Sequence, residues 1–347
     1  MTPGEQPRRG RVSQRAPSGS AATPPGRVSA LFHEGERAVQ RRAGAERAAA
    51  QVGRSILSFV PAEFGGFLSR QPFVVVASQD LRGRVWASLI AGGVGSARAL
   101  DGRQVLLAGR PAPADPLEGA LDRPPAQIGV LAIEFGTRQR IRLNGAAQRT
   151  GDGILLTVAE AFGNCTKYIQ RRLPAGQLNG SAAPTRRESA ALDDRQAALA
   201  RRADTFFIAS AHPERGADAS HRGGRPGFVE VAAGGRRLTF PDYGGNRMFQ
   251  TLGNLAINPR AGLLFLDWET GTTLQLTGQA QIVWDPQALW SRPGAERLVE
   301  ITVDAVNEHE RALPARWRLI EPYRRNPPIT PQGGEQHGTG MATRPSW

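Results

Sequence analysis

Several residue types are scarce in this chain of 347 residues, and each scarcity argues against a class of protein. Cys165 is the only cysteine, so no internal disulfide can form and the reducing cytoplasm is the expected location. No apolar run approaches the about 18 residues that a membrane-spanning helix needs, so we expect no membrane partner. Residues 1–29 lack the apolar centre of a secretory signal and are predicted to be a disordered tail, with a cleaved organelle presequence as the alternative.

Lysine and aromatic residues are also scarce, although the formal net charge is +13. A strongly basic chain is typical of nucleic-acid-binding proteins. Here, however, the 44 basic residues include one lysine, Lys167, so the other 43 are arginine, a skew that indicates a coding bias. The arginines are scattered, and only 6% of residues are aromatic, which leaves few rings for stacking on bases. We therefore expect no nucleic-acid partner.

The sequence contains an internal repeat. Residues 128–148 align with residues 261–281 without a gap, at an offset of 133 residues. Each copy begins with a β-favouring run, 73–77 in one and 206–209 in the other, and short strands with Gly or Pro turns follow. This pattern is typical of a small antiparallel barrel. The chain is therefore predicted to be mainly β with short helices and to consist of two copies of one unit.

The repeat also sets the expected domain boundaries. Residues 193–202 have the pattern of a capped helix that opens the second copy, and the polar segment before them is predicted to be a linker. The expected parts are a disordered tail at 1–29, a first barrel at 30–172, a linker at 173–192, a second barrel at 193–325 and a disordered tail at 326–347.

One stretch of the second copy, residues 236–281, has the features of a ligand site. It is predicted to form a strand over 238–240, a turn at 241–245, a helix capped by Asn246, and a hairpin. A polar, Gly-rich loop that leads into a helix N-terminus is a place where a phosphate can bind. Such a loop is also often only a turn, and both interpretations stay open on composition alone.

The string LTFPDYGGNRMFQTLGNLAINPRAGLLFLDWETGTTLQLTGQA resembles the FMN-binding split barrel of the pyridoxamine 5′-phosphate oxidase superfamily, in its oxidase-related branch. The similarity extends over roughly residues 31–325. Split barrels of this kind work as dimers with FMN between two barrels, so the resemblance implies two tandem split β-barrels that form an intrachain pseudo-dimer. The residues that carry the resemblance are Asn258-Pro259, Ala261, Leu263, Phe265 and Gly278, with Ser220-His221-Arg222-Gly223-Gly224 upstream.

The resemblance also implies FMN as the cofactor and places its contacts mainly in the second copy. Arg222 is the best candidate for the phosphate, because a guanidinium group binds phosphate through two hydrogen bonds. The segment 157–172 resembles one that follows the last barrel strand in this branch and could reach across to the partner barrel. The candidate cofactor-binding residues are Ser220, His221, Arg222, Tyr243, Asn246, Arg247, Met248, Gln250, Thr251 and Gln275 from the second copy, with Asn164 and Lys167 from the first.

Other positions are expected to be inactive. The first copy has Ser88-Leu89-Ile90 where the second has Ser220-His221-Arg222, so we expect one competent site per chain. His33 belongs to an opening segment that, by resemblance, packs across the first barrel, and a structural role is expected for it. The histidines show no ligand spacing, so no metal site is expected. No catalytic residue can be named.

The function implied by the resemblance is that of a flavin-dependent oxidoreductase acting on an unidentified small-molecule substrate. Its electron donor would be NAD(P)H or a protein of the ferredoxin or ferredoxin-reductase type. Because the flavin performs the chemistry, the lack of an acid–base constellation agrees with this interpretation. The alternatives are a non-enzymatic flavin-binding or degenerate barrel acting as a sensor, store or assembly partner, and a relative that binds a deazaflavin or haem. A homodimer of the whole chain is also open.

Overall fold

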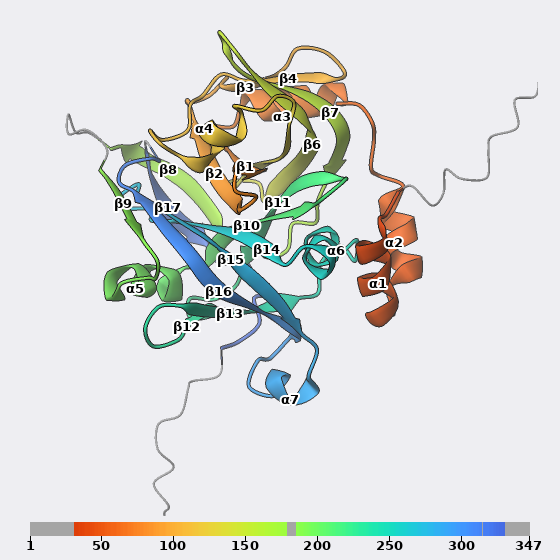
Figure 1. Cartoon of the computed structure of the whole chain (residues 1–347), viewed down its shortest axis with the longest axis vertical. Coiled ribbons are helices and arrows are strands. Elements are labelled where there is room, and N and C mark those ends of the chain that lie inside the picture. The colour runs from red at the N-terminus through yellow and green to blue at the C-terminus, as the bar shows by residue number, and fades with distance from the viewer. Residues whose placement is uncertain (1–30, 179–184, 314, 330–347) are drawn as a thin grey trace, which may run out of the picture. The chain divides into compact units, whose positions relative to one another are not determined.

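The structure is a computed structural model that describes residues 31–178, 185–313 and 315–329 (Figure 1). The described residues from His33 onward form one compact unit. Within the described residues, no helix is both long and apolar enough to cross a membrane. The tail expected at 1–29 lies outside the described residues, as does the tail expected at 326–347 from residue 330 onward.

The first half forms a seven-stranded sheet in the order β2-β1-β5-β6-β7-β4-β3. All of its neighbouring strands are antiparallel. An isolated bridge between Ala91 and Arg110 draws the open end of β2 toward β4, which curls the sheet into a partly closed barrel. The strands are β1 (Phe73–Gln79), β2 (Val85–Ala91), β3 (Ala97–Ala99), β4 (Gln104–Leu107), β5 (Ala126–Glu134), β6 (Gln139–Thr150) and β7 (Gly153–Gly163).

The second half repeats this topology in the order β11-β10-β14-β15-β16-β13-β12. The equivalent strands even share an irregularity, because the register shifts at Asn144/Gly145 in β6 and at Thr277/Gly278 in β15. The prediction of a mainly β chain with short helices is confirmed, and the two sheets have the same strand order. The strands are β10 (Thr205–His212), β11 (Gly216–Gly223), β12 (Glu230–Val231), β13 (Arg237–Tyr243), β14 (Arg260–Leu266), β15 (Thr273–Val283) and β16 (Ala295–His309).

The two halves pack face to face through apolar side chains of both sheets, which form one shared core cluster. Gly129 and Gly262, equivalent positions of the repeat, lie at this interface. A Cβ on Gly129 would be 2.7 Å from the Cα of Asp218, and one on Gly262 would be 2.6 Å from the Cα of Trp86. Backbones of opposite halves therefore approach each other closely at both glycines. The intrachain pair of barrels is thus a packed unit, related by an approximate twofold axis.

The segment expected to be a linker contains two strands, which corrects that prediction. Strand β8 (Arg171–Gln177) pairs with β17 (Ala315–Glu321), and β9 (Arg186–Ser189) pairs with β16. A polar, turn-rich composition did not reveal them, because both lie at the surface where side chains need not be apolar. Residues 179–184 of the expected linker lie outside the described residues.

Seven helices of the described residues surround the sheets: α1 (Glu34–Arg42), α2 (Glu46–Gly53), α3 (Ala62–Ser69), α4 (Pro116–Ala120), α5 (Asp194–Arg202), α6 (Gln250–Ile257) and α7 (Pro286–Leu289). The capped helix expected at 193–202 is α5, with Asp193 as its N-cap. The opening helix α1 packs on α6 of the second half and not across the first barrel, so that expectation was wrong (Figure 1). The side chain of Gln40 fixes this position by donating to the carbonyl of Met248 (2.9 Å).

The helix expected to begin after Asn246 begins at Gln250 instead. Asn246 accepts a hydrogen bond from the backbone N–H of Met248 (3.1 Å) and so closes a local turn. Arg247 and Phe249 both have positive φ values, 67° and 62°, which a helix does not allow. These four residues consequently form an irregular loop between β13 and α6.

Candidate functional site

A polar pocket lies at the interface of the two halves, beside the loop that joins β13 to α6. Its cavity volume is about 70 Å³, and it is open to solvent. The lining residues are Arg140, Arg142 and Asn164 from the first half and Ser220, Arg222, Asp242, Tyr243, Gly245, Asn246, Arg247, Phe249, Gln250, Thr251 and Leu252 from the second.

Arg142 of β6 crosses the interface and is almost completely buried. Its Nη1 donates to Asp218 Oδ1 and to Gln250 Oε1, both at 2.8 Å, and its Nη2 donates to Ser220 Oγ at 2.9 Å. The ion pair with Asp218 compensates its charge. Burial raises the pKa of Asp218, which Arg142 opposes. Arg142 therefore holds β11 and α6 of the second half in place.

Arg140, two residues earlier on the same strand, is partly buried and has no such compensation. Its Nη1 lies 3.0 Å from Nδ1 of His221, and its Nη2 donates to the carbonyl of Lys167 at 2.9 Å. Among the described residues, no carboxylate forms an ion pair with it. Burial, reinforced by Arg142 and Arg222, lowers the pKa of Arg140 to about 9. The guanidinium is still protonated at pH 7 and presents an unbalanced positive charge.

The second half supplies more cations around the pocket. Arg222 of β11 lies 3.7 Å from Asp242, and Arg297 of β16 lies 3.3 Å from the other oxygen of the same carboxylate. Arg247 forms a 2.6 Å ion pair with Glu296, which Arg297 also contacts. Asp242 and Glu296 therefore each contact two arginines, and one negative charge faces two positive charges at each carboxylate. Burial lowers the pKa of Arg222, and the nearby carboxylate of Asp242 opposes this shift.

The pocket and its direct partners carry excess positive charge. Five arginines meet three carboxylates, which leaves two positive charges. Four of the pocket's side chains also have buried N–H groups without an acceptor among the described residues. A bound anion would supply both the missing charge and the missing acceptors. The arginines are Arg140, Arg142, Arg222, Arg247 and Arg297, the carboxylates are Asp218, Asp242 and Glu296, and the unpaired groups are Arg140 Nε, Arg142 Nε, Arg222 Nε and Asn164 Nδ2.

The three tyrosines of the chain lie together at one side of the pocket. Tyr243 lines the pocket, and the ring of Tyr168 lies 5.3 Å from it. Tyr323 lies 5.5 Å from Tyr168, so the three rings support one another. Burial raises the pKa of Tyr243 to about 12, so its phenol stays neutral and can donate a hydrogen bond at neutral pH. Tyr243 and Phe249 give the mouth an aromatic lining.

Most residues predicted from the sequence come together here, and the two halves do meet at the site. Asn246 of the second half donates to Asn164 of the first at 2.9 Å, as expected for the segment that follows β7. His221 and Lys167 lie behind the pocket as partners of Arg140, and Met248 is buried beside it. The predicted residues that line the pocket are Ser220, Arg222, Tyr243, Asn246, Arg247, Gln250, Thr251 and Asn164.

Gln275 does not join the pocket, which corrects the expectation for this residue. It is buried elsewhere at the interface and donates to the carbonyl of Ala87 and to Asp115. The two halves are related by an approximate twofold axis. Strand β15 of the second half therefore faces the first half, just as β6 of the first half faces the second, so Gln275 lies away from the pocket. Arg140 and Arg142 were missed for the same reason. The signal was present in the sequence, because the repeat aligns them with Thr273 and Gln275.

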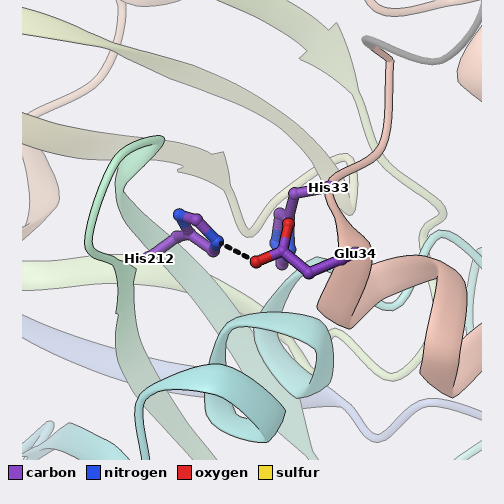
Figure 2. Close-up of side chains that lie close together, drawn as sticks. All are labelled: His33, Glu34 and His212. Carbon is purple, nitrogen blue, oxygen red and sulfur yellow. Dashed lines mark hydrogen bonds and ion pairs between the residues drawn. The ribbon is translucent and has the colours of Figure 1, made fainter.

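A second cluster, His33, Glu34 and His212, is the one group among the described residues with three side chains close enough to share a metal ion (Figure 2). Spacing along the sequence did not reveal it. Its hydrogen bonds argue against metal binding. Nδ1 of His33 accepts from the N–H of Gly35, and Nδ1 of His212 accepts from the N–H of Glu214.

Because both Nδ1 atoms are acceptors, each neutral ring carries its proton on Nε2. Nε2 of His33 faces Asn254 Oδ1 at 2.9 Å, and Nε2 of His212 faces Glu34 Oε1 at 3.1 Å. The nitrogens that would face a metal are thus N–H donors. Burial lowers the pKa of His33 to about 4, which keeps it neutral. With its capping box on Glu36, His33 has the structural role that was expected.

Comparisons with known proteins agree with this fold. The family model described as pyridoxamine 5′-phosphate oxidase matches residues 192–321, from just before α5 to the end of β17. Comparison with curated proteins found no match.

Solved structures similar to the chain each cover about a third of it. HupZ of Group A Streptococcus is 12% identical, with 36% of this chain and 98% of that chain covered and a TM-score of 0.27. The FAD binding protein from Mycobacterium smegmatis is 15% identical, with 37% and 98% covered and a TM-score of 0.25. A FAD-binding protein from Mesorhizobium loti is 12% identical, with 36% and 97% covered and a TM-score of 0.25. At this level of similarity they do not indicate what this chain binds. The second half of the chain, residues 192–321, is thus similar to the pyridoxamine 5′-phosphate oxidase family.

Proposed function

We propose that the protein is a flavoprotein that binds FMN in the pocket between its two halves. The observation that carries the proposal is Arg140, a protonated guanidinium without a carboxylate partner in a pocket that already has excess positive charge. The phosphate monoester of FMN has up to two negative charges, which matches the two charges in excess. The similarity of residues 192–321 to the pyridoxamine 5′-phosphate oxidase family supports a flavin as the ligand.

In this proposal, Arg140 and Arg222 bind the phosphate, and Asn164 donates its unpaired Nδ2 hydrogen. Arg142 already has three acceptors, so it holds β11 and α6 in position and does not bind the ligand. The cavity volume of about 70 Å³ suits a phosphate, and the flavin ring would lie in the open mouth beside Tyr243 and Phe249. A ring face against aromatic side chains excludes water from that side.

We further propose that the protein is an oxidoreductase. A bound flavin supplies two-electron transfer, and the residues around it bind, orient and shield it. NAD(P)H or a reductase-type protein is the proposed electron donor, with a small molecule as the substrate. The common topology of the two sheets and the 133-residue offset support an origin by internal duplication.

The binding proposal is tested on the purified chain. Flavin absorbance, followed by acid release and chromatography, shows whether a flavin is bound and whether it is FMN or FAD. Arg222→Ala should lower flavin retention, whereas Arg54→Ala, at an exposed position outside the pocket, should not. A colourless protein that does not bind added FMN would refute the proposal. Bleaching by NADH or NADPH without oxygen distinguishes an enzyme from a flavin store.

A further inference from the structure

A second cavity lies between the C-terminal end of α5, the turn that joins β14 to β15, and β17. Its volume is about 530 Å³, within the range of about 300–1,000 Å³ that is typical of small-molecule sites, and it is open to solvent. It shares no lining residue with the arginine-rich pocket. We call it the tryptophan groove, because Trp268 and Trp317 line it together with Arg172, Asp204 and Leu319.

The two tryptophans form an aromatic corner in the groove. Their ring centroids lie 6.0 Å apart and their planes meet at 65°. The backbone N–H of Trp317 donates to the carbonyl of Trp268 at 2.8 Å, which ties the two residues together. On the core side, Phe73 and Phe135 pack against Trp317, each with a centroid distance of 5.8 Å. The corner is therefore held in place before any ligand arrives, and a flat ring can pack against it at a low entropic cost.

The groove also has hydrogen-bond donors without acceptors. Nε1 of Trp317 and both Nε and Nη1 of Arg172 are buried and have no acceptor among the described residues. Arg172 is fixed in position, because its Nη2 donates to both oxygens of Asp204 at 2.7 Å and its guanidinium lies 4.7 Å from the ring centroid of Trp268. Indole and guanidinium groups donate but do not accept, and buried donors without acceptors cost free energy. A ligand that suits this groove therefore brings an acceptor.

The charges that line the groove are balanced, in contrast to those of the arginine-rich pocket. Arg172 pairs with Asp204 at 2.7 Å, and Arg202 pairs with Asp267 at 2.8 Å. One further arginine and one further carboxylate are exposed. An anion would find no excess positive charge here, so the groove favours a neutral ligand. The charged lining residues are Arg172, Arg202, Arg318, Asp204, Asp267 and Glu269.

We propose that the tryptophan groove is a second ligand site, which binds a small, neutral, flat aromatic molecule that carries a carbonyl group. The ring of the ligand packs against Trp268, Trp317 and Leu319, and its carbonyl oxygen accepts from the unpaired N–H groups of Trp317 and Arg172. This site is separate from the pocket proposed for FMN and does not depend on the proposed function.

Equilibrium dialysis of the full chain with coumarin tests the proposal. Coumarin is neutral, flat and bicyclic and has a carbonyl group, whereas naphthalene has a similar shape and no acceptor. One equivalent of coumarin should bind. Trp317→Phe keeps an aromatic ring but removes the N–H, so it should weaken coumarin binding about 2- to 10-fold, as the loss of one neutral hydrogen bond implies, and have a smaller effect on naphthalene. Trp290→Phe, at a tryptophan that is 83% exposed and outside the groove, is the matched control and should change neither.

Near-ultraviolet circular dichroism establishes that each variant is folded. If Trp317→Phe does not fold, Leu319→Asn decides, because Leu319 is 43% exposed and its loss should weaken coumarin binding without unfolding the chain. The proposal is overturned if the unaltered chain does not bind coumarin, if folded Trp317→Phe weakens both compounds equally, or if Leu319→Asn binds coumarin unchanged. Saturating FMN should leave coumarin binding intact, and displacement would place coumarin in the arginine-rich pocket and also overturn the proposal. If FMN itself does not bind, the proposed function fails while the coumarin result still decides this site.

Discussion

Replacing Arg140 with glutamine should separate ligand binding from folding. Arg140 has no carboxylate partner, and burial together with two neighbouring arginines disfavours its charge. Removing the charge relieves this repulsion, which offsets the loss of its hydrogen bonds to His221 and the carbonyl of Lys167. Each of these hydrogen bonds comes from a charged donor and contributes about 1.5–3 kcal/mol. Because the relief of repulsion offsets part of this loss, we expect the free energy of unfolding of the ligand-free protein to fall by less than it does in Arg142→Gln.

The affinity for FMN should fall as well. A hydrogen bond to a charged group contributes about 1.5–3 kcal/mol, which corresponds to roughly a 10- to 150-fold rise in the dissociation constant. Fluorescence titration with FMN measures this change, and chemical denaturation of the ligand-free protein measures stability. Because the interaction is electrostatic, the loss should be smaller at high salt.

Arg142→Gln is the matched contrast, because Arg142 lies two residues away on the same strand and its charge is compensated. Its removal leaves Asp218 buried without a cation, which typically costs about 3–5 kcal/mol of stability. If Arg140→Gln destabilised the ligand-free protein as strongly as Arg142→Gln, or left FMN affinity unchanged, the assignment of Arg140 to the ligand would be wrong.

Three further predictions concern stability. Burial raises the pKa of Glu36 from 4.5 to about 8, so the folded state holds a proton that the unfolded state releases, and stability should fall as pH rises from about 4.5 to 8. Glu36→Gln should flatten this part of the stability profile, and an unchanged slope would exclude Glu36 as its source. Gly262→Ala should destabilise the protein by about 1–3 kcal/mol or more in thermal unfolding, because its Cβ would contact the Trp86 backbone. Gly119→Ala is the control and should leave the stability unchanged, because no atom lies within 4 Å of the position of its Cβ. Zinc should leave the Tm unchanged, because the Nε2 atoms of His33 and His212 are donors, and a rise that His212→Ala abolishes would contradict this tautomer assignment.

The sequence indicated the main barrel strands and the repeat, because both depend on local patterns. Apolar runs and turn glycines mark those strands, and a constant offset relates the two copies without any structural knowledge. The exposed strands β8 and β9 have no such pattern and were missed. The loop after β13 could also be identified as a candidate site, since its polar residues are adjacent in the sequence. The start of α6 could not be predicted, because an Asn at this position can either cap a helix or close a local turn, and the sequence does not distinguish the two. In the structure Asn246 closes a turn.

Only the tertiary structure decided which residues of the first half reach the pocket beside the loop that joins β13 to α6. Gln275 and Arg142 occupy equivalent places on equivalent strands, yet Gln275 is buried against Asp115 and Arg142 lines the arginine-rich pocket. Sequence patterns specify which side of a strand is buried, but not which opposing strand it will meet. That choice follows from the packing of two apolar sheet faces, where Gly129 and Gly262 let the backbones approach and fix the twofold arrangement.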